Sequence, residues 1–179
     1  MANFMGLSGR AFIEAIEAWI GKTLPDEFYA ARREEDERVL REGIEAVAGA
    51  VAFIESLPAD LPRAIASSSS VEWIRRHLAH LGLAERFEPN LFSGKQHVAR
   101  GKPAPDIYLH AAAAMGVPIE RIAIIEDSPV GVTGAVASGA LVIGLAAGSH
   151  CFEGHAERLL GCGAHVVAHS FEEVAAALR

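Results

Sequence analysis

The sequence predicts an α/β protein that consists of a doubly wound parallel sheet with a small helical region before it. From about residue 47 onward, helical and strand patterns alternate with short connections, as in a parallel sheet covered by helices on both faces. Residues 122–126 form an apolar, β-branched run without polar alternation, which is typical of a strand buried on both faces. Residues 8–46 carry only helical patterns. We therefore divide the chain into a helical region, residues 1–46, and an α/β core, residues 47–179.

The helical region is expected to contain two helices. Ser8 can cap a first helix whose apolar residues recur with the helical period and which Gly21 ends. The second helix, at residues 25–41, is strongly charged on one side. In the core, the patterns predict helices at residues 50–57, 71–81, 105–115, 130–138, 153–160 and 171–178, and strands at residues 63–67, 91–93, 122–126, 141–145 and 165–168.

Composition argues against several classes of function. The chain has 179 residues, of which 51% are hydrophobic and 22% charged, as in an ordinary soluble globular protein. Its net charge of -7, without a compensating cluster of lysine and arginine, argues against nucleic-acid binding. No apolar run reaches membrane-spanning length and no signal peptide is recognisable, so we expect no membrane partner and a cytoplasmic protein. The oligomeric state is left open.

Two adjacent acids, Glu126 and Asp127, directly follow the apolar strand. Ser128 is a good helix N-cap and Pro129 suits the first helical turn, so the acids lie where a parallel strand gives way to a helix. In open α/β sheets, ligands bind at this carboxyl edge. Adjacent carboxylates repel unless a cation or a hydrogen-bond network holds them, which points to a hard metal ion. The alternative is a helix N-cap whose acids favour the helix dipole.

Two further loops are expected at the same edge of the sheet. The strand at residues 63–67 runs into a serine tract whose hydroxyl and N–H groups suit an anion; the alternative is a serine-rich connector with a routine N-cap. Lys102 precedes a helix and is braced by Pro103 and Pro105, so its side chain is aimed rather than free. A loop lysine is usually solvated, but beside an acidic metal site it can neutralise a phosphate. Hydroxyl, lysine and acid at three such loops form a set suited to phosphoryl transfer.

Three segments together resemble a known family. Residues 64–69, 101–106 and 125–132 are similar to the second, third and fourth motifs of the haloacid dehalogenase-like hydrolases, in the subgroup with a small helical cap. That subgroup contains sugar-phosphate phosphatases and β-phosphoglucomutase. Residues 4–10 resemble the substrate-facing segment of the cap. The resemblance implies a Rossmann-like core at residues 47–179 and a partial helical cap at residues 1–46.

The resemblance also implies roles for individual residues. By position, Ser67 would bind the transferring phosphoryl group, and Lys102 would hold the nucleophile and the phosphate together. Asp127 would ligate Mg²⁺ directly, and Glu126 would support the metal shell. The small phosphorylated substrate would be contacted by three further residues, Ser68, Ser69 and Arg10.

The family's first motif, a strand ending in Asp-x-Asp, is absent from this sequence. In the family, its first Asp is the nucleophile that becomes aspartyl-phosphate, and its second is the general acid/base. The sequence begins inside the expected cap, so we expect about 40 residues to be missing, judged from usual element lengths. The missing central strand would lie between the strands at residues 63–67 and 122–126, leaving a gap of about 10 Å. Because buried strand edges cannot stay unsatisfied, we expect either that these strands pair directly or that another chain fills the gap.

Three functions remain open from the sequence. The resemblance favours a Mg²⁺-dependent phosphatase of small phosphorylated metabolites such as sugar phosphates, here N-terminally truncated and inactive alone. A phosphosugar mutase on the same scaffold is the second. The third is a non-catalytic remnant that binds phosphate or Mg²⁺, or pairs with another polypeptide.

Overall fold

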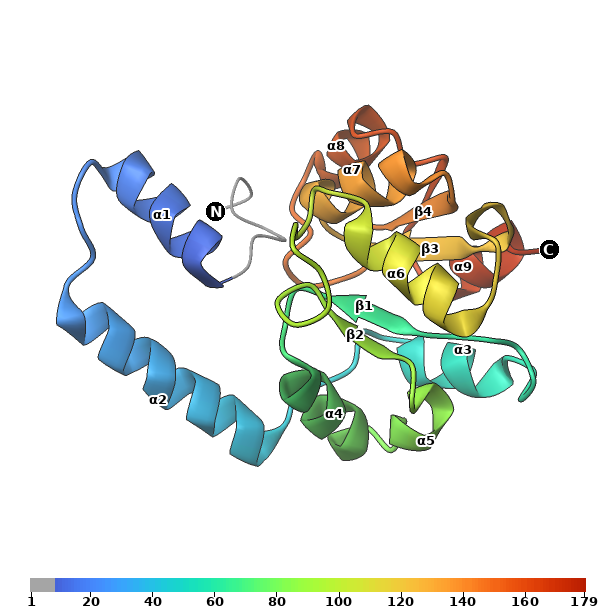
Figure 1. Ribbon diagram of the computed structural model, residues 1–179, viewed down its shortest axis with the longest axis horizontal. Helices are drawn as coiled ribbons and strands as arrows, with labels where there is room; N and C mark the ends of the chain where they lie inside the picture. Colours follow the sequence, from blue (N-terminus) through green and yellow to red (C-terminus); the bar gives the residue numbers. More distant parts are fainter. Residues whose placement is uncertain (1–8) are drawn as a thin grey trace.

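The N-terminal helices project to one side of the α/β body (Figure 1). The computed structural model describes the backbone of residues 9–179 and the side chains of residues 12–179. The two predicted helices are present as α1 (Gly9–Ile20) and α2 (Asp26–Glu42). The Arg32 guanidinium lies 5.1 Å from the centre of the Phe12 ring, so the two helices contact each other. Helix α2 contains no buried residue, and Trp19 at the end of α1 is 75% exposed, so this pair of helices contributes little to the core.

The α/β body follows the predicted alternation. Its helices begin where expected because serine side chains accept hydrogen bonds from the first turns: Ser70, Ser128 and Ser170 each accept a backbone N–H three residues on. The short helix α5 and the 3₁₀ turn η2 were not predicted. The elements of the body are α3 (Ala50–Ser56), β1 (Ile65–Ser67), α4 (Val71–His80), α5 (Ala84–Phe87), β2 (Leu91–Ser93), α6 (Asp106–Met115), η2 (Ile119–Arg121), β3 (Ala123–Glu126), α7 (Pro129–Ser138), β4 (Leu141–Leu145), α8 (His155–Gly161), β5 (Val166–Ala168) and α9 (Phe171–Ala177).

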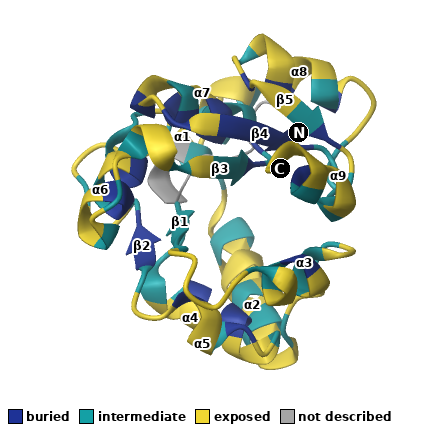
Figure 2. Cartoon of the chain, turned by 90° about the vertical axis from the view of Figure 1, so that its right-hand side faces the viewer, coloured by how far each residue is buried: buried dark blue, intermediate teal, exposed yellow. Residues whose placement is uncertain are grey.

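The strands form two parallel sheets rather than one. Strand β1 pairs with β2, with Ser67 opposite Ser93, and β3, β4 and β5 form a second sheet in that order. Strands β1 and β3 are neighbours in both views, but no sheet within residues 9–179 contains both (Figures 1 and 2). The prediction that they pair directly is therefore wrong, since each keeps the partner on its other side. The alternative, that another chain fills the space between them, stays a prediction.

The centre of the larger sheet is β4, not β3. Strand β4 is buried from Val142 to Leu145 (Figure 2), whereas Ala123 of β3 is exposed and Ile124 and Ile125 are only half-buried. The expectation that residues 122–126 are buried on both faces was therefore wrong, because β3 is an edge strand of its sheet. In β4, Val142 packs into a cluster with α6, α7 and α8, and Ile143 packs into one with α3 and α9. Helices thus cover both faces, as predicted for a doubly wound fold.

Helix α6 joins the two sheets. It contacts β1 and β2 on one side and packs against α7 on the other. Its residue Ile107, fully buried, belongs to one apolar cluster that also contains Phe92 of β2 and Val142 of β4. The two sheets therefore share a hydrophobic core although β1 and β3 share no strand ladder. Within the described residues, no helix is long and apolar enough to cross a lipid bilayer.

One buried side chain in α4 lacks hydrogen-bond partners. His77 is 7% exposed, and neither of its ring nitrogens has a partner among the described residues. Its ring packs edge-on against Trp73, with the ring centres 4.7 Å apart. Burial, together with the nearby His80, lowers the pKa of His77 below its usual value of 6.5. A proton on His77 is therefore disfavoured in the folded chain.

This burial predicts a pH dependence of stability. Because the pKa of His77 is lower in the folded state, the unfolded chain takes up the proton first, and the free energy of unfolding falls as the pH drops below about 6.5. We expect His77→Leu to reduce this loss of stability in urea titrations at pH 7.5 and pH 5.5, while the exposed control His169→Leu leaves it unchanged. An equal loss in wild type and His77→Leu would contradict the assignment.

Candidate active site

A pocket of about 480 Å³ opens at the carboxyl ends of β1 and β3. It is lined by residues 66–69, residues 125–128, Lys102 and His150. The structure thus brings together six residues that the sequence proposed for the site: Ser67, Ser68, Ser69, Lys102, Glu126 and Asp127. The side chain of Arg10, the seventh, lies outside the described part of the chain.

The serine tract forms the wall on the β1 side. The N–H of Ser69 donates to the hydroxyl oxygen of Ser67 at 3.1 Å, which leaves the Ser67 proton available as a donor. The N–H groups of Val71 and Trp73 in the first turn of α4 are bound within the protein, by Gln96 Oε1 at 2.7 Å and by Ser70 Oγ at 3.3 Å. An anion in the pocket would therefore meet the loop at residues 67–69 before the helix end itself. Gln96 was not predicted, because nothing in its sequence context marks a long-range cap.

Lys102 and Glu126 form a buried ion pair between the loop before α6 and the end of β3. Lys102 Nζ binds Glu126 Oε1, and each side chain is only 8% exposed. Removing two charges from water costs several kcal/mol per ion, which their attraction offsets only when the remaining polar atoms are also satisfied. The sequence predicted Lys102 at the same edge of the sheet as the acids, and in the structure the acid that it binds is Glu126.

Tyr108 and Ser128 complete the hydrogen bonding of Glu126. The Tyr108 hydroxyl lies 2.7 Å from Glu126 Oε1 and 3.0 Å from the carbonyl oxygen of Gly131, and the Ser128 hydroxyl donates to Glu126 Oε2 at 3.3 Å. Burial, aided by the Glu126 carboxylate, raises the pKa of Tyr108 far above its usual range, so the hydroxyl keeps its proton and remains a donor. No role was predicted for Tyr108, because in the sequence it occupies an ordinary apolar position of the helix that became α6.

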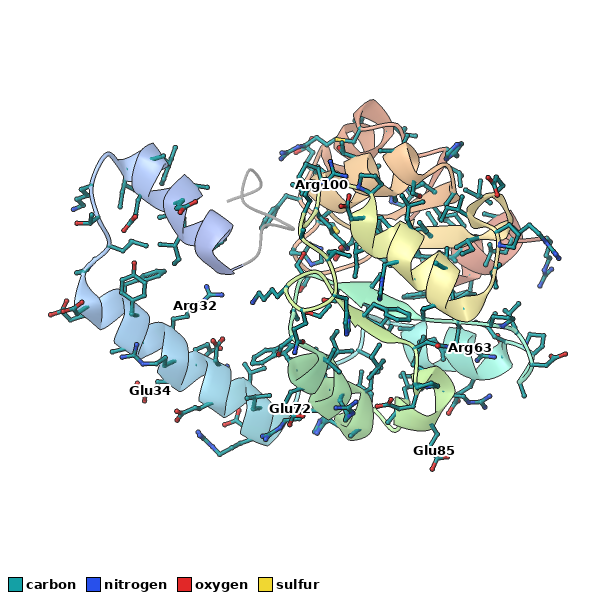
Figure 3. All side chains as sticks on the ribbon, viewed as in Figure 1. Arg32, Glu34, Arg63, Glu72, Glu85 and Arg100 are labelled. Carbon is teal, nitrogen blue, oxygen red and sulfur yellow. The ribbon has the colours of Figure 1, made fainter. Side chains whose placement is uncertain are left out.

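The loop that carries Lys102 is fixed at both ends. Arg100, labelled in Figure 3, binds both carboxylate oxygens of Asp106 at 3.0 and 2.9 Å. On the other side the loop lies against α7, where a Cβ on Gly134 would be 2.9 Å from the carbonyl oxygen of Pro103. A Cβ on Gly131 would collide with the Glu126 carboxylate. Both glycines of α7 are therefore required by close approach.

Asp127 is the acid that faces the pocket. Its side chain is 49% exposed, and its Oδ2 lies 3.0 Å from Nε2 of His150. Among the described residues, no group of three or more His, Cys, Asp or Glu side chains could hold a metal ion by itself. Mg²⁺ is commonly held by one or two carboxylates together with water and substrate phosphates, and the exposed oxygens of Asp127 fit such a partial site. Glu126 is bound by Lys102, Tyr108 and Ser128. It is therefore not expected to ligate the ion directly.

The network around Glu126 predicts the effect of Tyr108→Phe. The substitution keeps the ring but removes the donor to a buried carboxylate, so we expect the free energy of unfolding to fall by about 1–3 kcal/mol. Tyr29→Phe, on α2 and away from the pocket, is the matched control and should change stability by less than about 0.5 kcal/mol. Urea denaturation measures both, and equal effects would show that the hydroxyl contributes nothing.

The close approach at α7 predicts the effect of Gly131→Ala. The added methyl group forces the Glu126 carboxylate aside, and we expect a loss of about 1–3 kcal/mol in the free energy of unfolding, as in other overpacked sites. Gly161→Ala in α8 is the control, since its Cβ would have no atom within 4 Å. If both variants unfold at the same denaturant concentration, the Glu126 contact does not constrain this position.

Known proteins with similar sequences point to one family of hydrolases. The family model for haloacid dehalogenase-like hydrolases matches residues 4–139. Hexitol phosphatase A of Escherichia coli is 37% identical over 113 residues, which are 63% of this chain and 51% of that protein. The 6-phosphogluconate phosphatase of E. coli is 29% identical over 149 residues, 83% of this chain and 66% of that protein. The chain therefore spans between half and two thirds of the length of these two relatives.

Solved structures share the fold over nearly the whole chain. A haloacid dehalogenase-like protein of unknown function from Agrobacterium tumefaciens has a TM-score of 0.83 at 31% identity, covering 96% of this chain and 78% of that one. A hydrolase of this family from Deinococcus radiodurans, solved with bound phosphate and sodium, has a TM-score of 0.75 at 29% identity, covering 98% and 76%. With the family match over most of its length and this shared architecture, the chain belongs to the haloacid dehalogenase-like hydrolases.

Proposed function

We propose that this chain carries the phosphate-binding and metal-binding half of a Mg²⁺-dependent phosphatase for small phosphorylated metabolites such as sugar phosphates. The observation that carries the proposal is the pocket itself, in which serine hydroxyls, Lys102 and Asp127 face one space at the carboxyl ends of two strands. The names of the relatives, hexitol phosphatase and 6-phosphogluconate phosphatase, support the substrate class.

Each wall of the pocket would serve a different part of the substrate. Ser67 would donate a hydrogen bond from its hydroxyl to an oxygen of the transferring phosphoryl group, and Lys102, fixed by Glu126, would place its positive charge beside the same group. Asp127 would hold the Mg²⁺ ion, with Glu126 supporting the metal shell through water. When bound, the ion would neutralise charge on the phosphoryl oxygens. Ser68, Ser69 and Arg10 would contact the rest of the substrate.

The nucleophile would come from outside these 179 residues. The space between β1 and β3, which have no common sheet, is where a strand ending in Asp-x-Asp would place a carboxylate next to Lys102 and Asp127. Its oxygen would attack phosphorus while the bond from phosphorus to the substrate oxygen breaks, and the second Asp would protonate that leaving oxygen. Water, deprotonated by the same Asp, would then release inorganic phosphate and restore the carboxylate.

A phosphosugar mutase remains the second candidate. It is favoured by the likeness of this chain to a solved structure of a putative β-phosphoglucomutase from Thermotoga maritima, with a TM-score of 0.69 at 25% identity. The two activities differ in product, because a phosphatase releases inorganic phosphate and a mutase returns an isomerised sugar phosphate. A non-catalytic phosphate- or Mg²⁺-binding protein is the third, and it predicts binding without turnover in the complete gene product.

The test compares the 179-residue chain with the complete natural gene product, identified by its intact mass. We expect the complete protein to release phosphate from sugar phosphates only with Mg²⁺, and the 179-residue chain to show no turnover. Asp127→Asn in the complete protein should lower kcat/KM about 100-fold or more, as the loss of a single charge-stabilising group does. The exposed Asp60→Asn is the matched control and should leave kcat/KM unchanged.

Three outcomes would contradict the proposal. Full Mg²⁺-dependent turnover by Asp127→Asn would remove the metal assignment. Turnover by the 179-residue chain alone, at the rate of the complete protein, would show that no external aspartate is needed. Isomerised sugar phosphate without release of inorganic phosphate would replace the phosphatase with the mutase.

A further inference from the structure

The loop between β4 and α8 reaches across to the end of β3 and contacts Asp127. His150, in this loop, places its Nε2 3.0 Å from Asp127 Oδ2 and lines the pocket. The match to the family model ends at residue 139, and the motifs that carried the resemblance end at residue 132, so neither assigns His150 a role. The contact therefore rests on the geometry of this chain.

A second histidine of the same segment holds the backbone of the same acid. His155, at the start of α8 and 5% exposed, donates from Nε2 to the carbonyl oxygen of Asp127 at 2.7 Å. The two imidazole rings lie edge-on, with their centres 6.2 Å apart. Asp127 is thus held at its main chain by a buried histidine and at its carboxylate by a half-exposed one. Both contacts on Asp127 come from this one segment.

The loop is shaped to hold the His150 ring in this place. The N–H of Cys151 donates to the carbonyl oxygen of Gly148 at 2.9 Å, which closes a turn around His150. The ring folds back over Gly148 so closely that a Cβ there would collide with its Cε1 atom. A glycine at position 148 is therefore a condition of the contact between His150 and Asp127.

We propose that His150 is a positioning residue that orients the Asp127 carboxylate for a divalent cation and so raises the affinity of the pocket for Mg²⁺. The proposal rests on the metal site of the proposed function. Carboxylates that bind metals are commonly held by outer hydrogen bonds, and removal of such a partner typically weakens metal binding about 10- to 100-fold. His150 Nε2 lies beside one carboxylate oxygen of Asp127, where it would hold the rotamer and leave the other oxygen to the ion.

The experiment measures the dissociation constant of Mg²⁺ by isothermal titration calorimetry on the full 179-residue chain. We expect His150→Ala to weaken Mg²⁺ binding about 10- to 100-fold. His150→Gln, whose side-chain amide can still donate from a similar position, should recover most of the affinity. Gly148→Ala should weaken binding although the imidazole is still present, because the methyl group displaces the ring. The control His169→Ala, exposed and outside the pocket, should bind as wild type does.

The variants separate failure of this inference from failure of the metal site. If Asp127→Asn abolishes Mg²⁺ binding while His150→Ala binds as tightly as wild type or more tightly, the site stands and the role of His150 is overturned. If the wild-type chain binds no Mg²⁺, or Asp127→Asn binds it unchanged, the proposed metal site fails and the inference fails with it. Circular dichroism of each variant checks that the fold is retained.

Discussion

The buried ion pair between Lys102 and Glu126 is the constraint around which the rest of the site is arranged. It ties the loop before α6 to the end of β3, and it is sheltered from water on both sides. Such a pair is tolerated only when every remaining lone pair of the carboxylate finds a donor, which explains the Tyr108 and Ser128 hydroxyls. It also explains why α7 has a glycine where it passes the ion pair, because a side chain at Gly131 would occupy the space of the Glu126 carboxylate.

This arrangement divides the work between two adjacent acids. Successive side chains at a strand end point to opposite sides, so Glu126 turns into the protein while Asp127 turns into the pocket. The sequence presents the two as one acidic pair, explained either by a metal ion or by a helix N-cap whose acids favour the helix dipole. In the structure the two acids differ: a hydrogen-bond network holds Glu126, whereas Asp127 keeps an exposed carboxylate at the pocket.

Much of the architecture could be predicted because its signals are local. Serine caps and apolar periodicity located the helices and strands of the body to within a few residues, and the three loops converge at one edge as parallel strands require. The predictions that were wrong concern features that depend on partners far away in the sequence. The burial of β3 and its separation from β1 are decided by which strand lies beside each, and no local pattern encodes that. Tyr108, Gln96 and His150 were missed for the same reason, since each acts on a residue at least 18 positions away.

The division into two sheets has a consequence for motion. Hydrogen bonds of a strand ladder transmit cooperativity, and here the ladder is interrupted between the two walls of the pocket. Strands β1 and β2, packed with α4 and α5 around their own apolar cluster, form one candidate unit of local opening, and β3 to β5 with their helices form another. Helix α6, the Lys102 loop and α3, whose Ile54 packs against the apolar clusters of both units, connect the two. The distance across the pocket is therefore set by side-chain packing. Such packing allows larger relative motion of the two walls than the backbone hydrogen bonds of a continuous sheet would.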